Sequence, residues 1–188
     1  MPEEARNQVA FLSLDWLLGE DTVEIWVGGI AAATTPGDGL TGRDLVALVA
    51  GLAPVDGGYN WRALSGARDG KPLIVLVQSP LQPACHPGHD LHVRLDVPYR
   101  GRDENGLPVR DVLPQLHALE DHFGRYADGA VIVAHETCDG VRTTHLYADR
   151  PAAAESLKPL IASWPDGRVR MTVTPDPAWK QVSHFTRR

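Results

Sequence analysis

The chain of 188 residues contains only two cysteines, Cys85 and Cys138, and only three lysines among its 18 basic residues. Two cysteines do not make the disulfide framework of a small secreted domain. No apolar run approaches the roughly 18 residues that a membrane-spanning helix needs. The first four residues, MPEE, are acidic and lack the basic and apolar regions of a secretory signal. We therefore expect a cytoplasmic protein without a membrane segment.

Several common functional motifs are also absent. The chain has no GxxxxGKS/T phosphate loop, no GxGxxG after a strand and no GxSxG turn, which argues against nucleotide-driven chemistry. The net charge of -6 opposes the counterion release that drives binding to nucleic acid, although residues 168–188 carry five basic side chains and one acidic side chain. The sequence thus predicts no cofactor and disfavours nucleic acid as a partner.

What the chain does contain is a repeated order of elements. The segment GLTGRD at residues 39–44 returns 67 positions later as GLPVRD, and the turn Asp69-Gly70 returns 70 positions later as Asp139-Gly140. Each of the two segments precedes a stretch whose apolar residues recur with a regular period, and each turn lies between two strand-like runs. One strand–helix–hairpin unit cannot cover its own apolar face. The repeat therefore indicates an internal duplication whose copies pack together.

Residues 91–174 predict a complete βαββαβ unit. Apolar and polar residues alternate over 91–97, as in a half-buried strand, and a helix capped by Asp111 follows. Strands at 130–134 and 141–148 flank Asp139-Gly140, a pair that favours a two-residue hairpin turn. A helical stretch from residue 151, interrupted by Pro159, and a strand at 169–173 complete the order. The predicted fold is α+β and ferredoxin-like, an antiparallel sheet with both helices on one face.

Residues 23–78 predict a truncated βαββ unit. A strand at 23–27, a helix capped by Asp44, and a hairpin with strands at 59–66 and 73–77 make up this half. The run at 73–77 lacks alternation, which predicts burial on both faces. The N-terminal segment is residues 1–22, within which 9–18 fit either a strand or a helix. A Pro-rich connector over 79–90 joins the halves, and residues 175–188 form a C-terminal tail. We expect the two halves to pack as one body.

The βαββαβ unit also provides a candidate working surface. With Asp139-Gly140 at the turn, Glu136 faces Thr143, Ala134 faces His145 and Ile132 faces Tyr147 on one side of the sheet. The polar residues of strand 91–97 lie beside them, and Arg168 and Arg170 flank them from the last strand. The candidate surface consists of His92, Arg94, Glu136, His145, Tyr147 and Arg170. A histidine beside a carboxylate can act in acid–base chemistry, but no nucleophile is positioned, so a solvated or covered sheet face is the simpler interpretation.

The densest group of metal-capable side chains lies in the connector. Cys85, His86 and His89 are close in sequence, and thiolate and imidazole suit zinc. Their spacing matches no standard zinc pattern, and no second CxxC or HxxxH supplies partners. A Pro-rich connector with polar fillers is therefore favoured over a metal site. Cys138 precedes the hairpin turn and is a candidate reactive thiol, but no paired histidine is identified for it.

Three stretches carry a resemblance to a known family. They are the strand–loop–helix entry over 91–119, the hairpin segment over 136–147, and the closing sequence DPAWK at 176–180. With these motifs, residues 91–185 resemble a bacterial family known only as domain of unknown function family 695. The resemblance implies no activity and no site residues. Its element order looks like that of regulators that bind and inhibit a ribonuclease E-type enzyme, which is an analogy of fold.

Three hypotheses about function follow. The first is a non-catalytic binding or regulatory module that acts through an unknown protein partner or through self-association. The second is a small-molecule or hydrolytic enzyme that uses His92, Glu136 and His145 on the sheet face. The third is an RNA-associated regulator that resembles the ribonuclease E inhibitors and binds through its basic C-terminal strand and tail. We favour the first, because the sequence shows no catalytic constellation.

Overall fold

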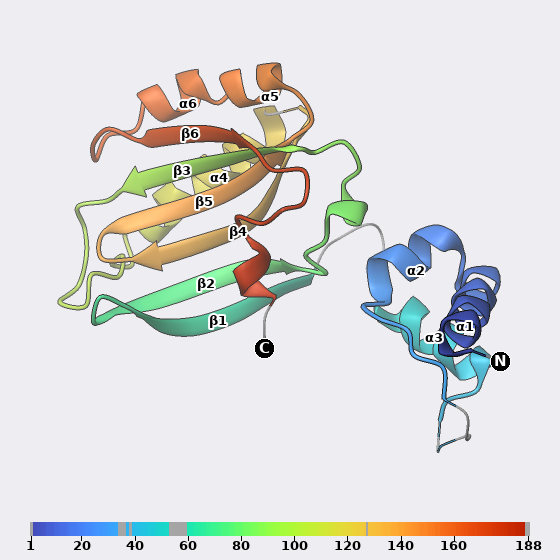
Figure 1. Ribbon diagram of the computed structural model, residues 1–188. Coiled ribbons are helices and arrows are strands. Elements are labelled where there is room, and N and C mark those ends of the chain that lie inside the picture. Colours follow the sequence, from blue (N-terminus) through green and yellow to red (C-terminus); the bar gives the residue numbers. More distant parts are fainter. Residues whose placement is uncertain (1, 34–36, 38, 53–59, 127, 187–188) are drawn as a thin grey trace. The chain divides into compact units, whose positions relative to one another are not determined.

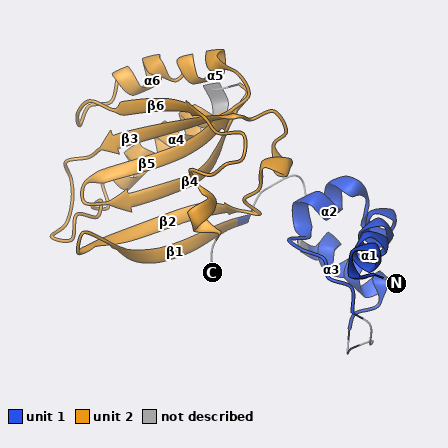
Figure 2. Cartoon of the chain, in the orientation of Figure 1, with its two compact units in different colours: residues 1–60 blue, residues 61–188 orange. Residues whose placement is uncertain are grey.

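A computed structural model describes residues 2–33, 37, 39–52, 60–126 and 128–186 (Figure 1). The chain divides into two compact units, residues 1–60 and residues 61–188 (Figure 2). The division falls at the start of the first hairpin rather than in the 79–90 connector, so the hairpin belongs with the second unit. Tyr59, the predicted start of that hairpin, lies outside the described residues.

The first unit is helical. It contains α1 (Glu3–Leu18), α2 (Glu20–Trp26) and α3 (Gly42–Leu52). The prediction of a strand at residues 23–27 was wrong, because all but the last of them belong to α2. Gly19 ends α1 with a φ of 84° and Glu20 and Asp21 place negative charge in the first turn of α2, where it is favourable. Three alternating apolar residues are too few to distinguish a strand from a helix.

The start of α3 is a capping box. The hydroxyl of Thr41 accepts a hydrogen bond from the backbone N–H of Asp44 at 3.2 Å, and the Asp44 carboxylate accepts one from the backbone N–H of Thr41 at 3.2 Å. The two residues thereby satisfy backbone donors that a helix start leaves unpaired. The cap is therefore Thr41 and not Asp44 as predicted, because Asp44 lies in the first turn of α3 and completes the box from there.

The second unit is a six-stranded sheet with helices. Its strands are β1 (Asn60–Arg68), β2 (Lys71–Ser79), β3 (Leu91–Pro98), β4 (Ala130–Cys138), β5 (Val141–Ala148) and β6 (Arg170–Pro175). The α-helices are α4 (Leu113–Tyr126), α5 (Pro151–Glu155) and α6 (Lys158–Ala162), and short 3-10 turns lie at Pro83–Cys85 and Ser183–Phe185. The strand order is β1-β2-β4-β5-β3-β6, and the pairs β2–β4, β4–β5, β5–β3 and β3–β6 are antiparallel.

The two faces of the sheet are covered differently. On one face, Leu95 and its apolar neighbours on β3 pack with Phe123 of α4 and Leu157, which follows α5. On the other face, the C-terminal segment contributes Trp179 and Phe185 to a second apolar cluster. The predicted C-terminal tail is therefore partly a packed element, which we call the strap (residues 176–185).

The α+β fold is confirmed, and the order β4-β5-β3-β6 is compatible with the ferredoxin-like unit. Two details differ from prediction. A bulge between Ile132 and Ala134 shifts the register, so Tyr147 pairs with Val131 and not with Ile132. Ile74 is 41% exposed, so β2 is not buried on both faces. Because 23–26 are helical, the first copy of the repeat also lacks its predicted strand, and the duplication stays a hypothesis.

Candidate functional site

The polar face of the sheet is arranged in three rows across the strands. Glu136, Thr143, Asp96 and Arg170 are successive partners in the first row. The second row runs Ala134, His145, Arg94, Thr172, and the third runs Val131, Tyr147, His92, Thr174. Directly paired residues share a face, so all six residues of the predicted surface lie on it. Their functional role stays a prediction.

A buried series of side chains runs across this face. Nε2 of His92 lies 3.0 Å from Nδ1 of His145, and Nε2 of His145 lies 3.0 Å from Oε1 of Glu136. The other carboxylate oxygen of Glu136 accepts a hydrogen bond from Arg68 of β1. His92, His145 and Glu136 are each no more than 5% exposed. We call these three buried residues, together with the exposed Arg68, the histidine relay.

Charge fixes the direction of the hydrogen bonds in the relay. Burial alone would raise the pKa of Glu136, but hydrogen bonds from His145 and Arg68 lower it to about 2, so the carboxylate is ionised and only accepts. Nε2 of His145 therefore donates to Glu136. In the neutral form of His145, Nδ1 then accepts from Nε2 of His92. Burial, with a smaller effect of His145, lowers the pKa of His92 to about 4.

The strap covers one end of the polar face. The Tyr147 hydroxyl donates to Asp176 at 2.6 Å, and the Tyr147 and Trp179 rings stack at 4.1 Å. The Trp179 indole donates to the backbone carbonyl of His89 at 3.0 Å. Burial, and then the bond to Asp176, raise the pKa of Tyr147 well above its usual range, so the phenol remains a donor. Phe185 packs edge-on against His145 at 5.7 Å.

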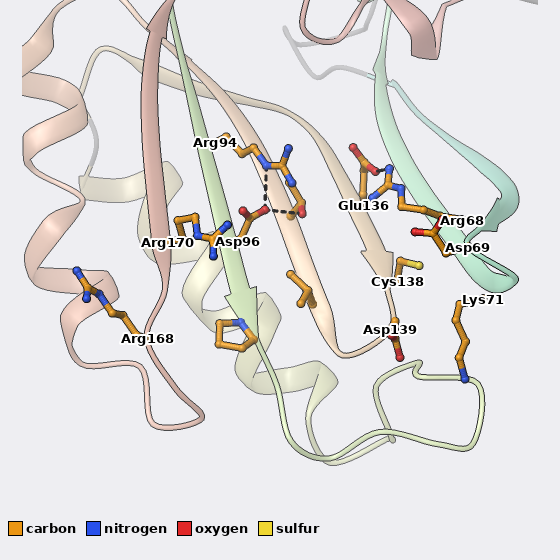
Figure 3. A pocket seen from close by; sticks show the side chains of 13 residues that line it. Arg68, Asp69, Lys71, Arg94, Asp96, Glu136, Cys138, Asp139, Arg168 and Arg170 are labelled. Carbon is orange, nitrogen blue, oxygen red and sulfur yellow. Dashed lines mark hydrogen bonds and ion pairs between the residues drawn. The ribbon is translucent and has the colours of Figure 1, made fainter.

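The other end of the polar face is open and concave. A pocket of about 540 Å³ lies between the β1–β2 hairpin and β6, and a second of about 370 Å³ shares Arg94, Asp96 and Arg170 with it. We call the two pockets together the trough. Figure 3 shows the side chains of the larger pocket, to which β6, β3, β4 and the β1–β2 hairpin all contribute. The larger pocket is lined by Arg68, Asp69, Lys71, Arg94, Asp96, Pro98, Glu136, Cys138, Asp139, Val141, Thr143, Arg168 and Arg170.

Positive charge exceeds negative charge in the trough. Five cationic and four acidic side chains line the larger pocket. Asp96 is held by Arg94 at 2.9 Å and by the Thr143 hydroxyl at 2.8 Å, and Glu136 is held inside the relay. Lys71, Arg168 and Arg170 form no ion pair with the residues that the structure describes. Asp69 also lines the larger pocket without an ion pair among the described residues, so three unpaired cations face one unpaired carboxylate and the trough carries an excess of positive charge.

The connector residues do not assemble into a metal site. The described part of the chain contains no group of three His, Cys, Asp or Glu side chains that could hold an ion. Burial raises the pKa of Cys85, which disfavours the thiolate that zinc needs. His86 instead stacks on Trp179 at 5.6 Å, and its Nε2 lies 3.3 Å from Oε1 of Gln78, so it supports the strap. Cys138 is a free thiol that lines the larger pocket.

Sequence reasoning missed three important residues of this face. Arg68, Asp176 and Trp179 reach the predicted surface from the hairpin and the strap, outside the βαββαβ unit from which the surface was predicted. Asp176 and Trp179 belong to the DPAWK motif. This motif indicated a family resemblance, but it did not indicate that these residues contact the polar face. No local pattern in the sequence indicated the pairing of Arg68 with Glu136, because it joins residues 68 positions apart.

A second charged group lies on the helix side of the sheet. Arg142 of β5 donates to Glu120 of α4 at 2.9 Å, and Nδ1 of His135 lies 3.1 Å from the same carboxylate. Burial would raise the pKa of Glu120, but His135 and Arg142 lower it. Trp61 of β1 stacks on His135 at 5.0 Å. These contacts tie α4 to the sheet and lie away from the trough.

The fold and this face define an α+β protein with a six-stranded antiparallel sheet that carries a buried histidine relay beside a basic trough. The model of the family of unknown function DUF695 matches residues 59–185, and the chain belongs to this family. Neither a curated protein nor a solved structure gives a significant match. Within the described residues, every helix is too short or too polar to cross a bilayer.

Proposed function

We propose that this protein is a non-catalytic cytoplasmic binding module that recognises an acidic surface of a protein partner through the trough. The observation that carries the proposal is the set of three cations, Lys71, Arg168 and Arg170, that line a concave pocket and form no ion pair with described residues. Arginine side chains suit carboxylates because their planar donors match them in two places. An acidic partner supplies the missing countercharges.

The relay supports binding better than catalysis. Both ring nitrogens of His145 lie within hydrogen-bond distance of a neighbour, so this ring has no free nitrogen for a substrate. His92 is 4% exposed, and its pKa of about 4 makes it a weak base at neutral pH. The relay instead fixes Glu136, which in turn fixes Arg68 at the edge of the trough. Its role is to hold the binding surface in place.

The test is a comparison of two charge-reversal variants in affinity purification from the native host. Arg168→Glu places a negative charge in the trough, whereas Arg110→Glu makes the same charge change at an exposed position outside it. We expect a partner that the wild type and Arg110→Glu retain and that Arg168→Glu loses. Equal retention by both variants contradicts the proposal. Loss of the partner after ribonuclease treatment favours the RNA-associated alternative instead.

One observation favours an enzyme as a second candidate. The relay leaves Nδ1 of His92 as its last acceptor, and His92 also lines the smaller pocket. Nδ1 of His92 can therefore accept a proton from a substrate, while Glu136 holds the other end of the hydrogen-bonded series His92–His145–Glu136. A thermal-shift panel of metabolites tests this, because a ligand at 100 times its Kd adds about 2.7 kcal/mol of apparent stability. A panel without any shift contradicts the enzyme for the compounds it contains.

A further inference from the structure

The outer edge of β6 is open for strand pairing. β6 is the last strand in the sheet order, and among the described residues it pairs with β3 alone (Figure 1). The backbone N–H of Asp176 donates to the carbonyl of Asp90 at 2.7 Å, and this bond continues the β3–β6 register. Bonded pairs alternate along an antiparallel ladder, so the even-numbered residues of β6 bond to β3. Met171 and Val173 consequently direct their backbone groups to the open edge.

A groove runs beside this edge on the helix side of the sheet. It has a volume of about 630 Å³, and its walls combine the apolar side chains of Ile161 and Ala162 of α6 and Met171 and Val173 of β6 with the charged side chains of Glu155, Lys158 and Arg168. Val173 is 40% exposed in it. Side chains alternate between the two faces of a strand, so a strand added to β6 places every second side chain in this groove. The side chains that face Met171 and Val173 there should be apolar, because these two residues form the strand's own wall of the groove.

The remaining side chains of an added strand fall on the polar face. There they lie beside Arg170 and Thr172, at the side of the trough that β6 forms. Arg170 and Arg168 form no ion pair with described residues, as noted above, so acidic side chains complement them. The two faces of β6 therefore select one sequence pattern, in which apolar and acidic residues alternate.

We propose that the β6 edge receives an extended segment of the partner protein as an additional strand, with apolar side chains in the groove and acidic side chains beside Arg170. Backbone hydrogen bonds to Met171 and Val173 supply affinity, and the alternating side chains supply specificity. This inference rests on the proposed function, because it names the form in which the acidic partner reaches the trough. It also explains how an edge strand with exposed apolar residues avoids non-specific pairing, since an arginine on its polar face disfavours many sequences.

The experiment is an NMR titration of the full-length, 15N-labelled protein with a synthetic peptide. The peptide is N-acetylated, C-amidated and alternates valine with glutamate over about eight residues, which is within the usual range of strand lengths. We expect the largest shifts at the amides of Met171 and Val173. A control peptide with the same composition, but with its valines and glutamates in two blocks, should bind at least about fivefold more weakly, because its side chains cannot match both faces.

Two variants of Val173 separate backbone pairing from side-chain contact. Val173→Pro removes the outward N–H without removing a bond to β3, and proline is tolerated at such positions of edge strands. Val173→Ala keeps the N–H and loses part of the groove wall. Loss of one hydrogen bond of about 1 kcal/mol corresponds to about fivefold weaker binding, so Val173→Pro should bind at least about fivefold more weakly than Val173→Ala. Unchanged β3 amide signals show that Val173→Pro is folded.

The outcomes distinguish this inference from the proposed function. Equal binding by the two variants, or no shift of the β6 amides up to millimolar peptide, overturns strand addition. Shifts confined to Lys71 and Arg168 overturn strand addition but leave the proposed function intact. Concentration-dependent shifts of the β6 amides together with a doubled molar mass, both without peptide, show that a second copy occupies the edge, and they overturn the inference as well.

Discussion

Replacement of Glu136 by glutamine probes the relay most directly. Glutamine keeps the shape of the side chain and one acceptor oxygen, but it removes the negative charge that His145 and Arg68 contact. Removal of one member of a buried charged pair leaves the other member without compensation. We therefore expect Glu136→Gln to lower the free energy of unfolding at neutral pH.

The magnitude follows from the pKa of Glu136. The native environment lowers this pKa from 4.5 to about 2, and one unit is worth about 1.4 kcal/mol, so the full effect is about 3 kcal/mol. The Arg68 side chain is 44% exposed, and water screens its share of the interaction. We therefore expect a loss of about 1–2 kcal/mol at neutral pH.

The stability difference between wild type and Glu136→Gln should depend on pH. A lowered carboxyl pKa stabilises the native state above pH 4.5, and this stabilisation is lost as the pH falls toward about 2. The wild type should thus approach the stability of Glu136→Gln in acid, with about half of the difference gone near pH 3. Urea denaturation, followed by the amide NMR signals of β5, measures the difference at each pH in the second unit.

The matched control is Glu155→Gln. Glu155 pairs with Lys158, and both side chains are about 60% exposed, so this replacement should change the free energy of unfolding by less than about 0.5 kcal/mol. A difference between wild type and Glu136→Gln that is the same at pH 7 and near pH 3 refutes the reasoning. A loss of unfolding free energy in Glu136→Gln that is no larger than the loss in Glu155→Gln also refutes it.

Two further predictions concern the strap and His92. Tyr147→Phe removes the donor to the buried Asp176 carboxylate at 2.6 Å, and it should cost about 1–3 kcal/mol in thermal or urea denaturation. A loss below about 0.5 kcal/mol contradicts a role of this hydrogen bond in holding the strap. The imidazole signals of His92 in a two-dimensional NMR titration should have a midpoint near pH 4, because burial and His145 oppose its positive charge. A midpoint near the ordinary value of 6.5 shows instead that the ring is open to water.

The polar face could be predicted because two local rules determine it. Side chains of a strand alternate with a period of two, and Asp139-Gly140 sets which residues of β4 and β5 face each other. Asp139 and Gly140 indeed have φ values of 42° and 82°, as a type I′ turn requires. The register from this turn to Ala134 is as predicted. The predicted register is wrong beyond Ala134, because a bulge adds one residue to β4 there. No pattern in the sequence indicates this bulge.

The parts that sequence could not supply are contacts over long separations. Arg68 reaches Glu136 because the β1–β2 hairpin extends the sheet next to β4, whereas the predicted first half assigned this hairpin to a separate unit. The strap could not be foreseen as a cover, because residues 176–185 contain no regular pattern and are held by single contacts such as that of Trp179 with Tyr147. The helix α2 was missed because three alternating apolar residues are too few to distinguish a strand from a helix.

The division of the polar face bears on what this protein binds. Burial of a charge is costly unless it is paired, and the two buried carboxylates of the polar face, those of Glu136 and Asp176, are both held by hydrogen-bond donors. At the open end the cations Lys71, Arg168 and Arg170 lie without such partners among described residues, although the whole chain carries a net charge of -6. A sheet face that only stabilised the fold would not need this local excess of positive charge. The overall negative charge repels acidic molecules in general, and the trough attracts those that can reach it, so the combination favours a selective acidic partner.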